Sequence, residues 1–184
     1  DATFAVHDAE SALRTSEQVL ASVRRGLRVL TNASGFAGLI PNVGTNLVET
    51  LPDPTGIEDV AAIPGRVVDV KGAATVPGDP EFGVSEHVAG ILLAARAGGT
   101  DANAAVNVAY DDEILAAFSE AGYATVEFEA GEDAVESAVA TADLEAGEPF
   151  VLYQTGAHGV EAITYVLGPD APSVARAVVE TLLR

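Results

Sequence analysis

Residues 104–121 have the sequence AAVNVAYDDEILAAFSEA. The run Ala104–Tyr110 predicts a strand, and Asp111 predicts the N-cap of a helix that extends to Ala121. A strand followed directly by a helix is a building unit of layered α/β proteins. This stretch therefore predicts a sheet covered by helices.

The same alternation continues on both sides of this unit. Further helices are predicted at residues 8–30, 85–96, 132–141 and 173–183. Further strands are predicted at residues 36–40, 47–51, 60–63, 66–70, 123–129, 150–154 and 162–167. Turn residues fill 72–82, which is expected to be a loop. Several strand pairs have connections too short for a crossover helix, so the sheet should be mixed, with helices on both faces.

The helix predicted at residues 8–30 has apolar side chains at steps of three and four. They are Leu13, Leu20, Val23, Leu27 and Leu30. This spacing predicts a stripe that faces the core. Thr15 and Gln18 also fit a capping box, in which case the helix proper begins at that point. At the other end of the chain, Asp170 and Pro172 mark the start of the last helix.

Length and composition indicate one folded domain over residues 1–184. Hydrophobic residues make up 48% of the 184-residue chain and charged residues 20%, which excludes a disordered chain. The sequence begins with Asp1 and contains no methionine, so we expect it to be the C-terminal part of a longer chain.

The charge balance constrains the partners. Asp and Glu total 28 against 9 Lys and Arg, a net charge of −19, and a surface of this kind repels nucleic-acid backbones. We therefore expect no direct nucleic-acid contact. Acidic excess with a single lysine, Lys71, predicts a halophilic, cytoplasmic protein, because molar salt screens self-repulsion within about 3 Å. No apolar run approaches the roughly 18 residues of a membrane span.

A glycine turn precedes the helix predicted at residue 85. Backbone N–H groups in a first helical turn, together with the helix dipole, form a site for phosphate or diphosphate. Gly83, Ser85 and His87 lie in this segment, and the histidine could donate to a bound phosphate or transfer a proton. The alternative is that Ser85 only caps the helix and His87 only packs.

Arg66 follows a Pro-Gly break at the start of a predicted strand, and an arginine there is suited to bidentate phosphate binding. It could equally pair with one of the many carboxylates. The loop at residues 42–46 carries Asn42, Gly44 and Asn46, whose amides could bind a ring nitrogen or phosphate. A plain turn is the other interpretation.

A histidine between two glycines lies in the segment GAHGVE, residues 156–161. Gly156 and Gly159 would allow close approach of the backbone to a ligand. Glu161 could accept a hydrogen bond from a substrate amine or hold a magnesium ion through water. A glycine-rich hairpin connection explains the segment equally well.

Two kinds of catalytic site are disfavoured. The chain has no cysteine, and its three histidines, His7, His87 and His158, lack the close spacing of zinc ligands. No Gly-x-Ser-x-Gly elbow is present, which argues against a serine hydrolase of that type.

Five segments then occur in a set order. They are LIPNVGTN (39–46), IPGRV (63–67), FGVSEHVA (82–89), AVNVAY (105–110) and GAHGVE (156–161). Together they resemble the ThiN family of archaeal thiamine-phosphate synthases, over nearly the whole chain. The resemblance implies an AraD-like fold, three-layer α/β/α around a mixed β-sheet, as in the C-terminal domains of hydroxymethylpyrimidine kinases.

The resemblance also implies a chemistry. Family enzymes join hydroxymethylpyrimidine diphosphate to thiazole phosphate, with magnesium, and release pyrophosphate. The arginine and histidine of their Pro-Gly-Arg and Phe-Gly-x-Ser-x-His motifs are catalytic, and they correspond to Arg66 and His87. For a domain that senses its ligand, we expect phosphate at Arg66, the Ser85 hydroxyl and the helix amides, with the pyrimidine and thiazolium rings toward Asn42, Asn107 and Glu161.

The chain departs from the family pattern near this site. Glu86 replaces the second serine of Ser-Ser-His, and Gly90 stands where the enzymes tend to have arginine. Val160 and Ala162 stand where lysine and proline are common. Each lost charge-assisted contact is worth roughly 1.5–3 kcal/mol, so diphosphate binding should be weakened.

Two functions are therefore expected. The first is a domain that binds thiamine phosphate or its diphosphate and reports to an N-terminal helix-turn-helix, as in ThiR-like repressors of thiamine genes. Such a domain would be a homodimer and would contact DNA only through that other segment. The alternative is an active thiamine-phosphate synthase, which would need Mg²⁺; the sensor would need no cofactor.

Overall fold

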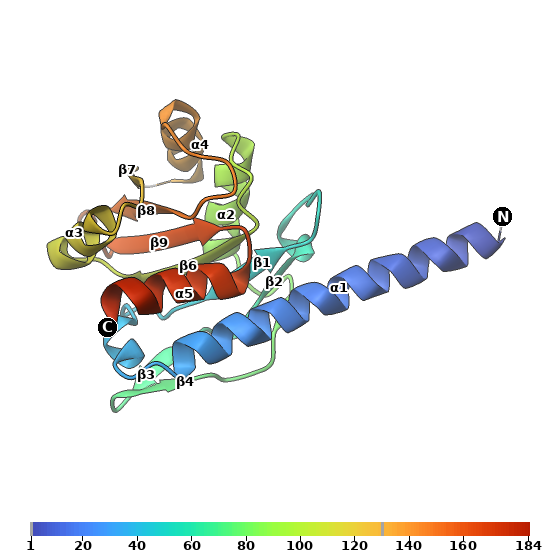
Figure 1. The fold of residues 1–184 in the computed structure, drawn as a ribbon, viewed down its shortest axis with the longest axis horizontal. Coiled ribbons are helices and arrows are strands. Elements are labelled where there is room, and N and C mark those ends of the chain that lie inside the picture. Colours follow the sequence, from blue (N-terminus) through green and yellow to red (C-terminus); the bar gives the residue numbers. More distant parts are fainter. Residues whose placement is uncertain (1, 130) are drawn as a thin grey trace.

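The computed structural model describes residues 2–129 and 131–184 (Figure 1). The helices are α1 (Ala2–Thr31), α2 (His87–Ala97), α3 (Asp112–Glu120), α4 (Glu132–Thr141) and α5 (Ala171–Leu182). The strands are β1 (Leu47–Thr50), β2 (Val60–Ala62), β3 (Val68–Val70), β4 (Ala73–Thr75), β5 (Glu81–Phe82), β6 (Ala104–Ala109), β7 (Thr125–Glu127), β8 (Phe150–Gln154) and β9 (Ile163–Gly168). None of the helices in the described ranges is long and apolar enough to cross a membrane.

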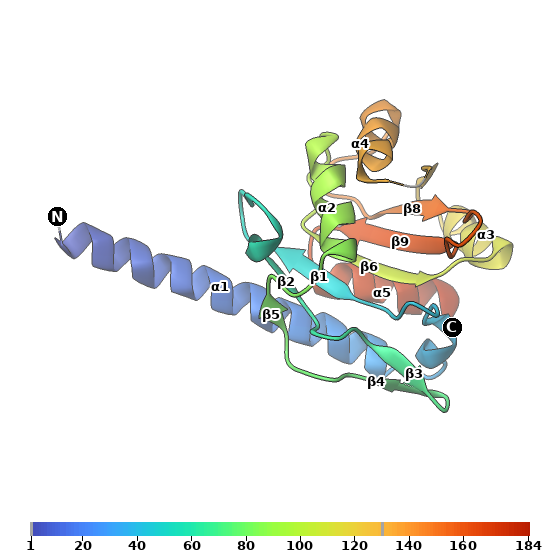
Figure 2. The same ribbon diagram turned by 180° about the vertical axis from the view of Figure 1, so that it is seen from behind.

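One seven-stranded sheet has the order β5-β2-β1-β6-β9-β8-β7. Only the β7–β8 pair is parallel within the described part of the sheet, and the other neighbours are antiparallel. Helices α1 and α5 cover one face, and α2 and α4 cover the other (Figures 1 and 2). Two separate apolar cores fill these layers, one on each face. The expected three-layer α/β/α fold around a mixed sheet is confirmed.

Predicted helix caps explain where two helices begin. The Asp111 carboxylate accepts a hydrogen bond of 2.6 Å from the amide of Ile114, and α3 starts at the next residue. The Asp170 carboxylate accepts one of 2.8 Å from the amide of Ser173, which starts α5. Both contacts satisfy amides that the helix cannot bond internally.

Two predicted elements are wrong. Residues 36–40 do not form a strand but a 3₁₀ turn, Phe36–Leu39, in which local bonds such as Gly38 N–H to Gly35 O replace a strand partner. Residues 72–82 are not one loop, because they contain β4 and β5. Strand β4 pairs with β3 around a two-residue turn, Lys71-Gly72, in which both residues have positive φ. Such a turn matches the twist of a hairpin.

Helix α1 also differs from its prediction. It begins at Ala2, and no capping box forms at Thr15, whose hydroxyl bonds the Ser11 carbonyl within the helix at 3.0 Å. Val23 and Leu30 are fully buried as expected, but 65% of Leu13 is exposed. The reason is visible in Figure 1, where the N-terminal half of α1 extends beyond the sheet.

Candidate functional site

The loop at residues 42–46 is fixed by two buried asparagines. The Asn46 side chain donates to the Ile63 carbonyl at 3.0 Å and accepts from the Ile63 amide at 2.9 Å. Asn107, on β6, accepts from the Asn46 amide at 2.7 Å and donates to the Gly44 carbonyl at 2.9 Å. Both side chains, predicted to face a ligand, bond the backbone instead and hold the loop against β2 and β6.

Glu161 closes the same loop from the other side. Its two carboxylate oxygens accept from the amides of Asn42, at 2.8 Å, and Val43, at 3.1 Å. The segment before it is a tight hairpin in which Ala157 and Val160 exchange backbone hydrogen bonds. Gly156 is required there, because an added Cβ would lie 2.9 Å from the Val160 carbonyl oxygen. Gly159 is the exposed turn glycine of this hairpin.

Arg66 is held in an unusual backbone conformation. It has φ of 63°, directly after Gly65 at 73°, and few residues other than glycine adopt such angles. Its Nη1 donates to the Val43 carbonyl at 2.6 Å. Gly44 leaves room for the arginine stem, because an added Cβ there would lie 3.1 Å from Arg66 Cβ. Strained polar residues of this kind concentrate at functional sites.

His87 is the first residue of α2 and is exposed. Its Nε2 lies 2.7 Å from the hydroxyl of Tyr165, a fully buried residue on β9. Ser85 is buried, and its hydroxyl accepts a long hydrogen bond of 3.5 Å from the Ala89 amide, so it caps α2 only weakly. The first turn of α2 thus points its histidine at the centre of the sheet.

Tyr165 links the two predicted catalytic residues. Burial raises the pKa of its hydroxyl above the ordinary range, although a hydrogen bond with the Gln154 side chain and the positive charge of Arg66 lower it. Arg66 therefore lies close enough to act electrostatically on the tyrosine that contacts His87. Sequence reasoning missed both Tyr165 and Gln154, because each lies in an apolar run that reads as a buried strand.

The structure brings most predicted site residues to one end of the sheet. There β1 and β9 begin and β2, β6 and β8 end. Arg66, the loop at residues 42–46, Asn107 and Glu161 all lie at this end. Gly83 does not, because its amide bonds the carbonyl of Val60, at the opposite end of β2 from Arg66.

The described residues contain no group of three or more His, Cys, Asp or Glu side chains placed to hold a metal ion. Both oxygens of Glu161 already accept from loop amides. The donor set at this end of the sheet therefore does not fit a metal held by the protein alone.

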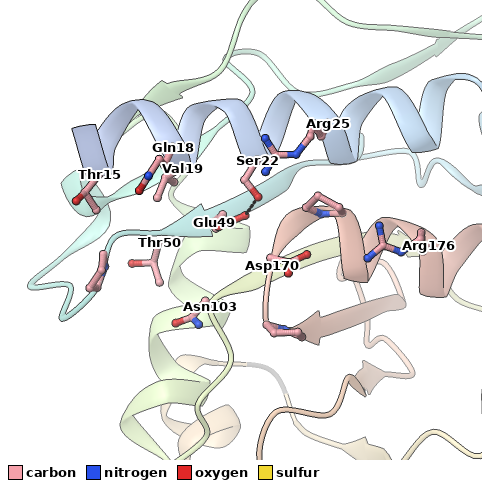
Figure 3. A pocket seen from close by; sticks show the side chains of 13 residues that line it. Thr15, Gln18, Val19, Ser22, Arg25, Glu49, Thr50, Asn103, Asp170 and Arg176 are labelled. Carbon is pink, nitrogen blue, oxygen red and sulfur yellow. Dashed lines mark hydrogen bonds between the residues drawn. The ribbon is translucent and has the colours of Figure 1, made fainter. Parts of the chain in front are cut away.

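A cavity of about 680 Å³ lies at the opposite end of the sheet, between α1 and α5 (Figure 3). Glu49, on β1, projects into it, and one of its oxygens accepts from the Ser22 hydroxyl at 2.6 Å and from the Ala171 amide at 2.8 Å. This carboxylate thus connects the two helices of that layer. Burial is the main cause that raises the pKa of Glu49.

We predict that Glu49→Gln stabilises the protein at neutral pH. A carboxyl whose pKa is raised by folding favours the folded state in acid, and this contribution is lost as the pH rises through the folded pKa. Glutamine keeps an oxygen for Ser22 and Ala171 without the buried charge. The melting temperature should rise by a few degrees at pH 7, and the difference from wild type should vanish in acid.

Thermal denaturation across pH measures this difference. Glu180→Gln, at an exposed ion pair with Arg184, is the control and should change little. A lower melting temperature of Glu49→Gln at pH 7 would show that the charge itself strengthens the contacts to α1 and α5.

Comparisons with known proteins bear on the family and the fold of this chain. The sequence model of the family described as "Thiamine-phosphate synthase ThiN" matches residues 22–180. The thiamine-phosphate synthase ThiN of Methanothermobacter thermautotrophicus is 30% identical over 175 residues, covering 88% of this chain and 90% of that protein. The bifunctional thiamine biosynthesis protein ThiDN of Methanocaldococcus jannaschii is 34% identical over 147 residues, which are 76% of this chain but 35% of that protein.

The fold also has a solved counterpart. The crystal structure of the C-terminal domain of a phosphomethylpyrimidine kinase aligns with a TM-score of 0.79. It covers 91% of this chain and all of that domain, at 22% identity. This likeness bears on the fold alone and agrees with the AraD-like class expected from the sequence.

Proposed function

The chain belongs to the ThiN family of thiamine-phosphate synthases, and from this premise we propose that it binds thiamine-phosphate precursors around Arg66, Tyr165 and His87 and joins them. The observation that carries the proposal is the assembly of Arg66, Tyr165 and His87, which come from three separate segments. Such an assembly is expected where a leaving group must be stabilised, and a sensing role does not require it.

The reaction breaks the carbon–oxygen bond between the pyrimidine methylene and the diphosphate, while a thiazole ring nitrogen forms the new bond to that carbon. Negative charge grows on the departing diphosphate. Arg66, with one of its five N–H donors used by Val43, has donors left for phosphate oxygens. His87, in the first turn of α2, can donate to the same group beside the helix amides.

Magnesium is part of this proposal only through the substrate. Because the described residues offer no ligand cluster, the ion would arrive bound to diphosphate oxygens and water. Here the chain's own residues bind and orient the phosphates.

A ligand-sensing role is the second candidate function. It is favoured by Glu86, which places an exposed carboxylate next to His87, and by Val160, which is exposed where a lysine would add a cation. A site with fewer cations suits the single phosphate of thiamine phosphate. In this role the domain would act as a homodimer, and light scattering that gives a monomer with and without ligand would exclude that arrangement.

Turnover and binding assays separate the two functions. Both synthase substrates are supplied with magnesium in molar KCl, and pyrophosphate release is measured for wild type and His87→Ala. We expect turnover in wild type and its loss in the variant. Binding of thiamine phosphate, measured by calorimetry, without any turnover would instead establish the sensor. If the domain shows neither binding nor turnover, its likeness to the family extends to the fold alone.

A further inference from the structure

We propose that Tyr165 is a positioning residue that donates its hydroxyl proton to Nε2 of His87 and thereby keeps the imidazole proton on Nδ1, the nitrogen that would contact the ligand's phosphate. The contact between Nδ1 and phosphate rests on the proposed function. The tautomer of His87 does not, and it can be measured on the protein alone.

The two partners differ in how firmly they are held. Tyr165 is fully buried on β9, a central strand that is paired on both sides with β6 and β8. Its ring packs 5.8 Å from that of Phe128. His87 is exposed at the start of α2, and its Nε2 lies 2.7 Å from the tyrosine oxygen. The fixed hydroxyl therefore orients the exposed ring.

The direction of this hydrogen bond follows from the burial of the hydroxyl. A phenol has one proton to donate, and Tyr165 is fully buried. A buried donor left without an acceptor is costly, and Nε2 of His87 lies 2.7 Å from the tyrosine oxygen. The hydroxyl therefore directs its proton to Nε2 of His87.

The direction of this hydrogen bond determines whether the other imidazole nitrogen, Nδ1, is a donor or an acceptor toward a ligand. A neutral histidine that accepts at Nε2 has its proton on Nδ1 and can donate to a phosphate oxygen. The opposite tautomer would present a lone pair, which phosphate oxygens repel. Arg66, whose charge acts on Tyr165, lies on the same part of the sheet and adds its donors to the same anion. Loss of a group that orients a histidine in this way commonly lowers activity by about 10–100-fold.

Nitrogen-15 NMR of the histidine side chains tests the tautomer. Spectra are recorded at alkaline pH, where imidazoles are neutral, and His87 is identified by its loss in His87→Ala. We expect the Nδ1–H form in wild type and a mixture of both tautomers in Tyr165→Phe. An Nε2–H form in wild type, or an unchanged spectrum in Tyr165→Phe, would overturn the proposal whatever the function of the domain.

Two further variants sharpen the test. Tyr153→Phe removes a half-buried hydroxyl from the neighbouring strand β8 and should leave the His87 signals unchanged. Gln154→Glu places a carboxylate acceptor beside Tyr165, because the Gln154 side chain is near enough to affect the pKa of that hydroxyl. The carboxylate should draw the tyrosine proton away and shift His87 toward Nε2–H. If Tyr165→Phe fails to fold, Gln154→Glu alone decides the test. An unchanged His87 tautomer in Gln154→Glu would then contradict the proposal.

Turnover then links the tautomer to the proposed function. Tyr165→Phe should lower kcat by roughly tenfold or more with little change in KM, whereas Tyr153→Phe should match wild type. If wild type has no turnover, calorimetry with thiamine phosphate replaces the turnover assay. The affinity of Tyr165→Phe for thiamine phosphate should then be lower than that of wild type by a similar factor. If Tyr165→Phe changes the His87 tautomer but neither activity nor affinity, Tyr165 does not position His87 for the ligand. The direction of the hydrogen bond from Tyr165 to His87 would still stand.

Discussion

Arg66→Gly is expected to reduce kcat/KM for the synthase substrates at least a hundredfold while the protein stays as stable as wild type. Two lost charge-assisted contacts to phosphate, at roughly 1.5–3 kcal/mol each, account for this loss, because about 1.4 kcal/mol corresponds to a factor of ten. The same substitution should weaken thiamine-phosphate binding if the domain is a sensor.

Stability should hardly change because two effects oppose each other. Arg66 has φ of 63°, a conformation that costs a residue with a Cβ about 1–2 kcal/mol and costs glycine little. Glycine removes this strain but also loses the 2.6 Å hydrogen bond to the Val43 carbonyl, worth about 0.5–1.5 kcal/mol. A surface arginine with negative φ has no such strain, so its replacement by glycine would bring no gain in stability to offset the lost hydrogen bond.

Lys71→Gly is the matched control for Arg66→Gly. Lys71 has φ of 55° in the exposed turn between β3 and β4, and it belongs to none of the predicted site segments. Its replacement should relieve similar strain and leave kcat/KM unchanged. Thermal denaturation and steady-state kinetics are measured on both variants. Full activity in Arg66→Gly would remove Arg66 from the phosphate site, and a large drop in its melting temperature would give it a structural role.

The sequence predicts the layers of this fold better than the details of its site. Local signals are sufficient for the helix that Asp111 caps, because a cap and the first helical turn are neighbours in the chain. Strand connections too short for a crossover helix were sufficient to predict a mixed sheet, although not its strand order. The exposed β3–β4 hairpin was missed because its turn, Lys71-Gly72, lacks the Asn-Gly or Asp-Gly pair that most often marks such turns.

Contacts between distant residues account for what the sequence could not give. Tyr165 and His87 are 78 positions apart, and a tyrosine within an apolar strand reads as a core residue until its hydroxyl partner is known. Asn107 carried a usable signal, because a lone amide within an apolar strand must find buried partners. Those partners proved to be backbone groups of the loop at residues 42–46.

Asn107→Leu is expected to produce the largest loss of stability, about 2–5 kcal/mol. Leucine has a similar size but leaves the Asn46 amide and the Gly44 carbonyl without their partner, and both residues are buried. Each buried polar group left unsatisfied costs about 1–3 kcal/mol. Domains are commonly stable by only 5–15 kcal/mol, so the variant should unfold at a clearly lower denaturant concentration.

Thr164→Val provides the opposite case on the adjacent strand. Thr164 is fully buried beside Val108, and among the described residues its hydroxyl has no hydrogen-bond partner. Removing that hydroxyl should leave stability unchanged or raise it by roughly 1 kcal/mol. Denaturant unfolding in molar KCl compares both variants with wild type.

Loss of the Asn107 contacts should also reach the site, because the loop they hold supplies the Val43 carbonyl that anchors Arg66. We therefore expect Asn107→Leu to speed hydrogen exchange at the Asn46 amide and to lower phosphate affinity, while Thr164→Val changes neither. Equal stability of Asn107→Leu and wild type would mean that water replaces the lost partner in the loop. Slow exchange at Asn46 together with reduced affinity would instead require a direct contact between Asn107 and the ligand, as the sequence alone had suggested.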